Sequence, residues 1–149
     1  MQATIKPSLQ GLRPAISFMT NLEIIRQLYA AFAARDRVTI LNLFHPNIVW
    51  IQNDGFPNGG THTGALTVLD GVFARLGQEW STWGAHVSEW LDAGGSIIAI
   101  GEYQGTHAST RRSMRAAFAH VYRVESGRIT RFQQFADTHQ VRTAMSPCA

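Results

Sequence analysis

The residue best suited to acid–base chemistry is a histidine inside an otherwise apolar strand pattern. His120 lies two residues from both Phe118 and Tyr122, and side chains two apart along a strand point to the same face. Because imidazole titrates near neutral pH, a histidine on an inward face can act as a general acid or base. A core histidine held by one hydrogen bond gives the same pattern, so both interpretations stay open.

Asp137 supplies a carboxylate where the last predicted strand ends. With Gln140 three residues later, it has the spacing of a helix N-cap. A carboxylate facing an apolar cavity would instead have a raised pKa and could serve as a general base. Counting outward from the turn at 125–127 places His120 opposite residue 133 or 134. Asp137 lies about three residues further along its strand, an offset of about 10 Å from His120. The two side chains are therefore predicted to contact a substrate separately rather than to form a linked pair.

Aromatic and polar residues that could line a pocket are spread along the chain, although such residues are more often simply core. The predicted substrate-binding set is Trp50, Tyr29, Tyr103, Phe118, Phe132, Gln134 and His45, the last only if its ring turns inward. Within this set Tyr103, Gln134 and Trp50 are the candidates for orienting a substrate. No pair of histidines has metal-ligand spacing and no glycine-rich phosphate loop follows a strand, so neither a metal nor a cofactor is expected.

The composition is that of one globular domain with a sizeable core. The chain has 149 residues, of which 45% are apolar and 15% charged. Its net charge of +3 comes from scattered arginines rather than a basic stripe, so nucleic acid is not an expected partner. No apolar run is long enough to span a membrane. The lone cysteine, Cys148, favours a reducing, cytoplasmic compartment.

The pattern of apolar residues predicts an N-terminal leader over residues 1–18 and a single domain over residues 19–146. Helical periodicity predicts a helix from Met19 to about Arg35, opened by a capping box of Thr20 and Glu23, and further helices over 36–44 and 65–76. Strands are expected at 48–52, 83–91, 96–106, 114–124 and 128–136, and a short helix after Asp137. Helices that mostly precede a meander of long strands indicate an α+β fold.

Three stretches in this order resemble the SnoaL-like group of the nuclear-transport-factor-like superfamily. They are YAAFAARD, LFHPNIVW and YQGTHASTRRSMRAAFAHVYRVESGRITRFQQFAD. The resemblance covers about residues 20–145. It implies a cone-shaped, curved antiparallel sheet packed on about three helices, a largely apolar pocket and frequent homodimers. The superfamily includes polyketide cyclases, steroid isomerases, epoxide hydrolases, dehydratases and non-catalytic binders, so the fold alone does not assign a function.

The resemblance also suggests roles for individual residues. His120 occupies the strand position at which steroid isomerases carry the acid that donates to the substrate oxyanion. Asp137, ten residues after Gly127, matches the catalytic aspartate of SnoaL-like cyclases. The chain departs from steroid isomerases at Ile51 and Gln52, where those enzymes have their base, which argues against steroid isomerisation.

The leading hypothesis is a small cofactor-free enzyme that abstracts a proton from an apolar carbonyl compound, as in aldol cyclisation, isomerisation or dehydration. Asp137 would be the base and His120 the donor to the developing oxyanion. The alternative is a non-catalytic binding protein for a small apolar ligand. Because the long strands carry apolar residues on both faces, a homodimer through the outer sheet face is expected.

Overall fold

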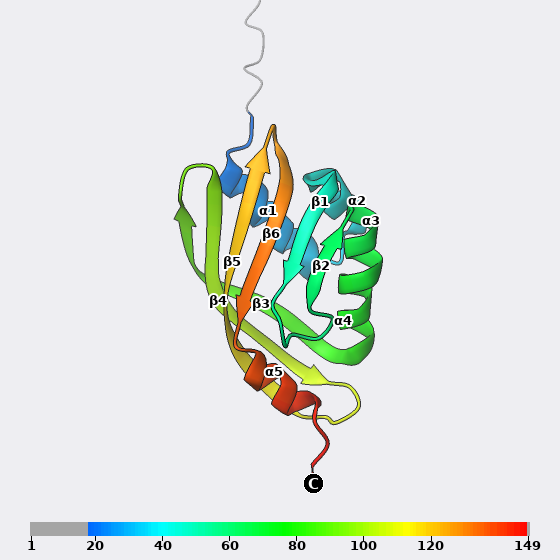
Figure 1. Cartoon of the computed structure of the whole chain (residues 1–149). Helices are drawn as coiled ribbons and strands as arrows, with labels where there is room; N and C mark the ends of the chain where they lie inside the picture. Colours follow the sequence, from blue (N-terminus) through cyan, green and yellow to red (C-terminus); the bar gives the residue numbers. More distant parts are fainter. Residues whose placement is uncertain (1–17, 149) are drawn as a thin grey trace, which may run out of the picture.

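The computed structural model describes residues 18–148, and the predicted leader, 1–18, lies outside them apart from its last residue. Figure 1 shows the elements along the chain. The helical elements are α1 (Asn21–Ala33), α2 (Arg37–Leu43), α3 (Ala65–Val68), the π-helical η1 (Leu69–Phe73), α4 (Ala74–Glu79) and α5 (Thr138–Met145). The strands are β1 (Phe44–Gln52), β2 (Gly60–Thr63), β3 (Trp80–Asp92), β4 (Ser96–His107), β5 (Ser113–Glu125) and β6 (Arg128–Ala136). The α+β fold class is confirmed.

One mixed, six-stranded sheet in the order β2-β1-β6-β5-β4-β3 organises the molecule. The meander β3–β6 is antiparallel, as tight turns require, and β2 is antiparallel to β1. Strand β1 joins β6 in parallel, which the expectation of an antiparallel sheet did not include. No hairpin links these two strands, because α3, η1, α4 and four strands lie between them in the sequence, so no turn fixes their direction.

Helices cover one face of the sheet, and α1 runs behind it in Figure 1. The predicted capping box opens α1: Thr20 Oγ1 accepts from the Glu23 amide at 3.2 Å, and the Thr20 amide donates to Glu23 Oε2 at 2.7 Å. The inward side of α1, with Ile25 and Leu28, packs into a core that includes Tyr122 of β5. This packing holds the middle of α1 against the concave side of the sheet.

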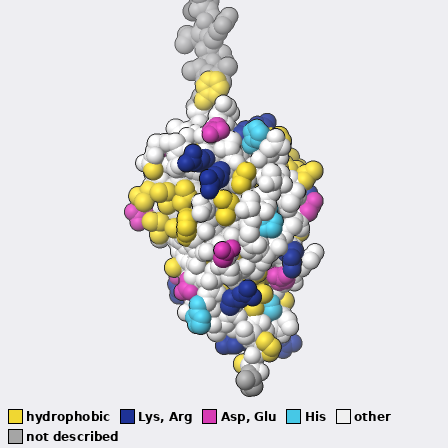
Figure 2. Space-filling model, viewed as in Figure 1, with side chains coloured by type: hydrophobic (Ala, Val, Ile, Leu, Met, Phe, Trp, Pro, Cys, Tyr) yellow, Lys and Arg dark blue, Asp and Glu magenta, His cyan; other side chains and the backbone are white. Residues whose placement is uncertain are grey.

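The opposite face of β3–β6 carries apolar side chains, which gather over β3–β5 in Figure 2. We call this the open-face patch. The register places its members in neighbouring rows, and they are Leu91, Ile98, Ile100, Ala119, Val121 and Phe135. Leu91 and Phe135 are exposed large hydrophobic residues.

A bulge bends β3 across β4, where the register shifts between Val87 and Glu89. A Cβ atom on Gly101 would lie 2.0 Å from the carbonyl oxygen of His86, so only glycine fits this crossing. Because a bulge bends its strand and increases the local twist, it helps the sheet curve around the space beneath the helices.

The segment between β1 and β3 differs from the prediction. Strand β2 was missed because its four residues, Gly-Thr-His-Thr, carry no apolar alternation. The helix predicted over 65–76 continues to Glu79 and passes through the π-helical turn η1, so Gly77 lies inside α4 rather than beyond its end. Strand β1 begins at Phe44, so His45 belongs to a strand. No helix in the described part of the chain is both long and apolar enough to cross a membrane.

Candidate active site

A cavity of about 600 Å3 lies between the helical layer and the concave side of the sheet. Its walls are largely apolar and aromatic, and the large apolar residues among them are Phe32, Ile40, Phe56, Leu69, Val72, Phe73, Leu76 and Trp83. Six buried or half-buried polar residues also line it and form what we call the polar floor: Tyr29, Gln52, Tyr103, His120, Tyr122 and Gln134. An apolar cavity with a few converging polar groups is the usual form of a small-molecule site.

A continuous chain of hydrogen bonds joins five residues of the polar floor. The Tyr122 hydroxyl donates to the Tyr29 hydroxyl at 2.9 Å. His120 lies between two phenols, with Nδ1 2.5 Å from the Tyr29 oxygen and Nε2 2.5 Å from the Tyr103 oxygen. Gln134 Nε2 donates to the same Tyr103 oxygen at 2.8 Å. All three tyrosines of the sequence therefore lie in one network around a single imidazole.

The protons of this network outnumber its hydrogen bonds by one. Neutral His120 and the three tyrosines carry one N–H and three O–H protons, and three hydrogen bonds join them in a line. Protonation of His120 at Nε2 leaves the Tyr103 hydroxyl proton free, and protonation at Nδ1 leaves that of Tyr29 free. Both phenols line the cavity. The tautomer of His120 therefore decides which phenol can donate to a ligand.

Burial keeps this network uncharged. Desolvation lowers the pKa of His120 to about 3, and the Phe118 ring stacks on the imidazole at 3.8 Å between ring centroids. Desolvation also raises the pKa of Tyr29 and Tyr103 above their ordinary value. At neutral pH His120 is a neutral imidazole and both phenols hold their protons, which is the state that the proton count describes.

Two glutamine amides of the polar floor are fixed in orientation by their partners. Gln134 Oε1 accepts from the Asn53 amide at 3.0 Å, so its Nε2 faces Tyr103. Gln52 Oε1 accepts from Trp50 Nε1 at 3.1 Å. Within residues 18–148 the structure gives Gln52 Nε2 no hydrogen-bond partner, so this amino group is a second donor that the cavity can offer.

The mouth of the cavity is basic. Its exposed ionisable residues are Arg35, Arg37 and His86. Arg37 pairs with Asp70 of η1 at 2.8 Å. Among the described residues that line the cavity, none is an aspartate or a glutamate.

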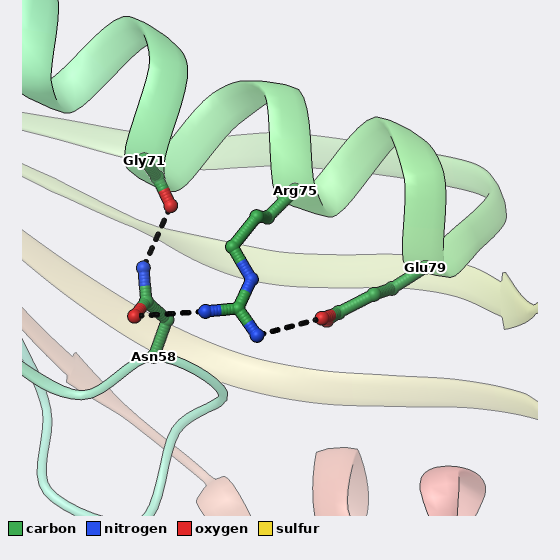
Figure 3. A network of polar contacts seen from close by, with 4 residues as sticks. All are labelled: Asn58, Gly71, Arg75 and Glu79. Atoms are coloured by element: carbon green, nitrogen blue, oxygen red, sulfur yellow. Dashed lines mark hydrogen bonds and ion pairs between the residues drawn. The ribbon is translucent and has the colours of Figure 1, made fainter.

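A second polar network, shown in Figure 3, fixes the π-helical wall of the cavity. Asn58 Nδ2 donates to the Gly71 carbonyl at 2.7 Å, and Asn58 Oδ1 accepts from Arg75 at 3.3 Å. Arg75 also reaches Glu79 at 3.3 Å. π-Helical turns occur often at functional sites, and here the turn carries Leu69 and Phe73 into the cavity wall.

The structure brings four of the predicted site residues together at the cavity: His120, Tyr29, Tyr103 and Gln134. His120 pairs with Gln134 across β5 and β6, the register expected from the turn. Tyr122 is a network member that the predicted set lacked, although its place two residues from His120 could have indicated it. Gln52 was considered only as a departure from steroid isomerases.

Asp137 does not face the cavity, and its prediction as a base there is wrong. The side chain is exposed, and Oδ1 accepts from the Gln140 amide at 3.3 Å as the N-cap of α5. The physical reason is strand alternation, since Gln134 points inward and the odd-numbered residues of this strand end point outward.

Four predicted substrate-binding residues lie outside the cavity lining. Trp50 stacks on Phe132 with 3.7 Å between ring centroids, and Phe118 stacks on His120. These three rings therefore pack against one another or against His120 instead of lining the cavity. His45 accepts from the Asn47 amide at 3.0 Å through Nδ1, and its ring does not reach the cavity. The prediction that these residues line the pocket is wrong, because their strand positions place them in the core or at the sheet end.

Comparison with known proteins identifies the family. Residues 25–132 match the SnoaL-like domain. The chain belongs to the SnoaL-like family. An NTF2-like protein from Burkholderia thailandensis is 37% identical, with a TM-score of 0.84 over 87% of this chain and 100% of that one. An NTF2-like protein of unknown function from Burkholderia pseudomallei is 28% identical, with a TM-score of 0.78 over 86% of this chain and 99% of that one.

A more distant structure shares the fold alone. TerC, co-crystallised with polyporic acid, is 23% identical, with a TM-score of 0.76 over 84% of this chain and 97% of that one. No functionally curated protein matches this chain.

Proposed function

We propose that the protein catalyses proton transfer on a small, largely apolar carbonyl compound bound in the cavity. The observation that carries this proposal is the line of three hydrogen bonds through His120, which leaves the hydroxyl proton of Tyr29 or Tyr103 without a partner in the network. A substrate carbonyl oxygen is an acceptor for that proton. Such a hydrogen bond strengthens as negative charge develops on the oxygen, so it favours enolisation.

The same network offers a route for the proton that leaves the substrate carbon. Starting with Nε2 of His120 protonated, Tyr103 gives its proton to the substrate oxygen and Nε2 replaces it. Tyr29 passes its proton to Nδ1, and the Tyr29 oxygen takes the proton from the substrate carbon. One C–H bond breaks and one O–H bond forms. Every side chain keeps its number of protons, and the surplus proton now lies on Tyr29.

An isomerisation is completed when Tyr29 gives its proton to a different carbon and Nδ1 of His120 replaces it. At the same time the enol O–H returns its proton to Tyr103, and Tyr103 passes one to Nε2, so the ketone and the first tautomer of His120 are restored. The enol formed in the first half is also the nucleophile that an aldol cyclisation requires. Concerted transfer along neutral groups suits a site in which desolvation opposes both an imidazolium and a phenolate.

The competing proposal is a binding protein that holds a ring compound without changing it. The absence of a carboxylate from the described cavity lining favours it, because no ordinary general base faces the ligand. TerC, which shares this fold, was co-crystallised with polyporic acid, and this supports a ligand-binding role for the fold in either proposal.

Hydrogen–deuterium exchange on a simple ketone separates the two proposals. The bicyclic ketone 2-tetralone is incubated with the protein in D2O, and loss of its α-protons is followed by NMR. An enzyme accelerates this exchange above the buffer rate. Tyr103→Phe and Tyr29→Phe should each reduce the acceleration by about a hundredfold, because each removes a donor and one link of the relay.

Asp137→Asn is the matched control, since asparagine also caps a helix and this side chain lies outside the cavity. It should leave the exchange rate unchanged. Binding of 2-tetralone without accelerated exchange would identify a binding protein and overturn the catalytic proposal.

A further inference from the structure

Arg35 has a backbone conformation that arginine disfavours. Its φ of 55° places it in the left-handed region directly after α1. The Arg35 amide donates to the Phe32 carbonyl at 3.1 Å and the Asp36 amide to the Ala31 carbonyl at 2.9 Å, which is the pattern of a Schellman motif. Glycine or asparagine is the usual residue at this point, because a Cβ is unfavourable there. A strained residue at a cavity mouth points to a role for its side chain.

Arg35 lies at the mouth of the cavity without an acidic partner among the described residues. Arg35 lines the cavity and is exposed, and within residues 18–148 it forms no ion pair, whereas neighbouring Arg37 is paired with Asp70. Both are mouth residues, so Arg35 is the cation left available to a ligand.

The polar floor and the mouth of the cavity would bind different groups of one ligand. The polar floor offers hydrogen-bond donors, the surplus phenol proton and Gln52 Nε2, and these fit a carbonyl or enol oxygen. The mouth offers a cation, and no carboxylate of the described lining competes for it. Aromatic walls between the ends, including Phe32, Phe73 and Trp83, suit a ring system.

We propose that the substrate is an aromatic or polycyclic carboxylic acid whose carboxylate binds Arg35 while its carbonyl oxygen reaches the polar floor. This inference rests on the proposed carbonyl chemistry and adds the second group of its substrate. Guanidinium and carboxylate are matched in geometry and charge, so the pair sets which end of the ligand enters first.

Paired probes test the proposal. The probe 6-hydroxy-2-naphthoic acid carries a hydroxyl at one end and a carboxylate at the other, and its methyl ester replaces the charged carboxylate with a neutral group. Binding of both is measured by titration calorimetry at low and at physiological ionic strength. The acid should bind about two- to fivefold more tightly than the ester, the range expected of one exposed ion pair, and the preference should shrink with added salt.

Substitutions at Arg35 make the test independent of folding. Arg35→Gly and Arg35→Asn remove the charge but suit the left-handed backbone, so their melting temperatures should stay equal to that of the parent protein or rise. Both should lose the preference for the acid with unchanged affinity for the ester. Arg35→Lys should retain the preference, and Arg37→Gln should reduce it less than Arg35→Gly does.

The possible failures are distinguishable. Equal binding of acid and ester, or a preference that persists in Arg35→Gly, overturns the assignment of the carboxylate while the exchange chemistry can still hold. Preferred binding of the acid with no effect of Tyr103→Phe, together with no ketone exchange, supports the carboxylate contact and overturns the proposed function. Failure of both probes to bind overturns the proposed substrate class, and the ketone exchange experiment then decides the proposed function by itself.

Discussion

Acidification should destabilise the protein through His120. Desolvation lowers the pKa of this imidazole to about 3 in the native state, whereas an exposed histidine titrates near 6.5. Below pH 6.5 the unfolded chain therefore binds a proton that the native state excludes, and the free energy of unfolding decreases as the pH falls. The stability that the neutral His120 imidazole contributes is fully present above pH 6.5 and is lost as the pH approaches about 3.

The difference between the two pKa values corresponds to roughly 5 kcal/mol over the whole range, and about 2 kcal/mol of this is lost by pH 5. The groups in direct contact with His120 are Tyr29, Tyr103 and Phe118, none of which carries a charge at these pH values. No neighbouring ion therefore offsets the cost of protonating the ring in place.

Urea unfolding at about pH 7.5 and about pH 5 measures this loss. His120→Gln, which cannot titrate, should lose about 2 kcal/mol less than the parent protein between these pH values. His139→Gln is the matched control, because His139 is exposed on α5 and its replacement should not alter the difference. Equal pH dependence in the parent protein and His120→Gln would refute the reasoning. If that variant does not fold, nitrogen NMR of the native imidazole decides, since protonation near pH 6 would equally contradict it.

Four further predictions concern stability and assembly. Tyr103→Phe leaves Nε2 of His120 and Nε2 of Gln134 without their shared hydrogen-bond partner and should cost about 2–4 kcal/mol in urea unfolding, against about 1 kcal/mol for Tyr122→Phe, which removes a single bond. Gly101→Ala should cost about 1–3 kcal/mol or more, because its methyl group meets a backbone oxygen of β3; an unchanged midpoint would contradict the bulge geometry. Asn58→Ala should destabilise more than Asn58→Gly, since only glycine keeps the left-handed backbone once the hydrogen bonds are lost. Sedimentation velocity at micromolar concentration should show a homodimer that Val121→Arg, in the open-face patch, converts to a monomer; a monomeric parent protein would rule this out.

Local patterns allowed the polar floor to be predicted in part. The alternation of Phe118, His120 and Tyr122 follows from strand geometry, and the tight turn at 125–127 fixes the pairing of His120 with Gln134. These inferences succeeded because each depends on residues close in sequence. The same alternation, followed to the end of β6, would have turned Asp137 outward.

The parts that could not be predicted depend on contacts between distant segments. Tyr29 meets His120 across 91 residues, and only the packing of α1 on the concave face brings them together. The parallel pairing of β1 with β6 has no local sequence signal, because no turn connects the two strands. The exposed position of Arg35 in a left-handed conformation likewise contradicts the residue preference that a sequence-based prediction uses.

The composition of the polar floor itself argues for a function rather than a structural role. Replacing a set of buried hydrogen-bonded partners with apolar groups of the same shape is nearly neutral or stabilising, so phenylalanine at the three tyrosine positions, with an apolar residue at His120, would serve the core as well. The chain instead concentrates all its phenols around one imidazole and leaves one proton without a partner among them. A buried polar network that is not fully satisfied by the protein is costly unless something else completes it. A ligand oxygen that accepts from Tyr29 or Tyr103 completes this one, and His120 selects which of the two phenols it meets.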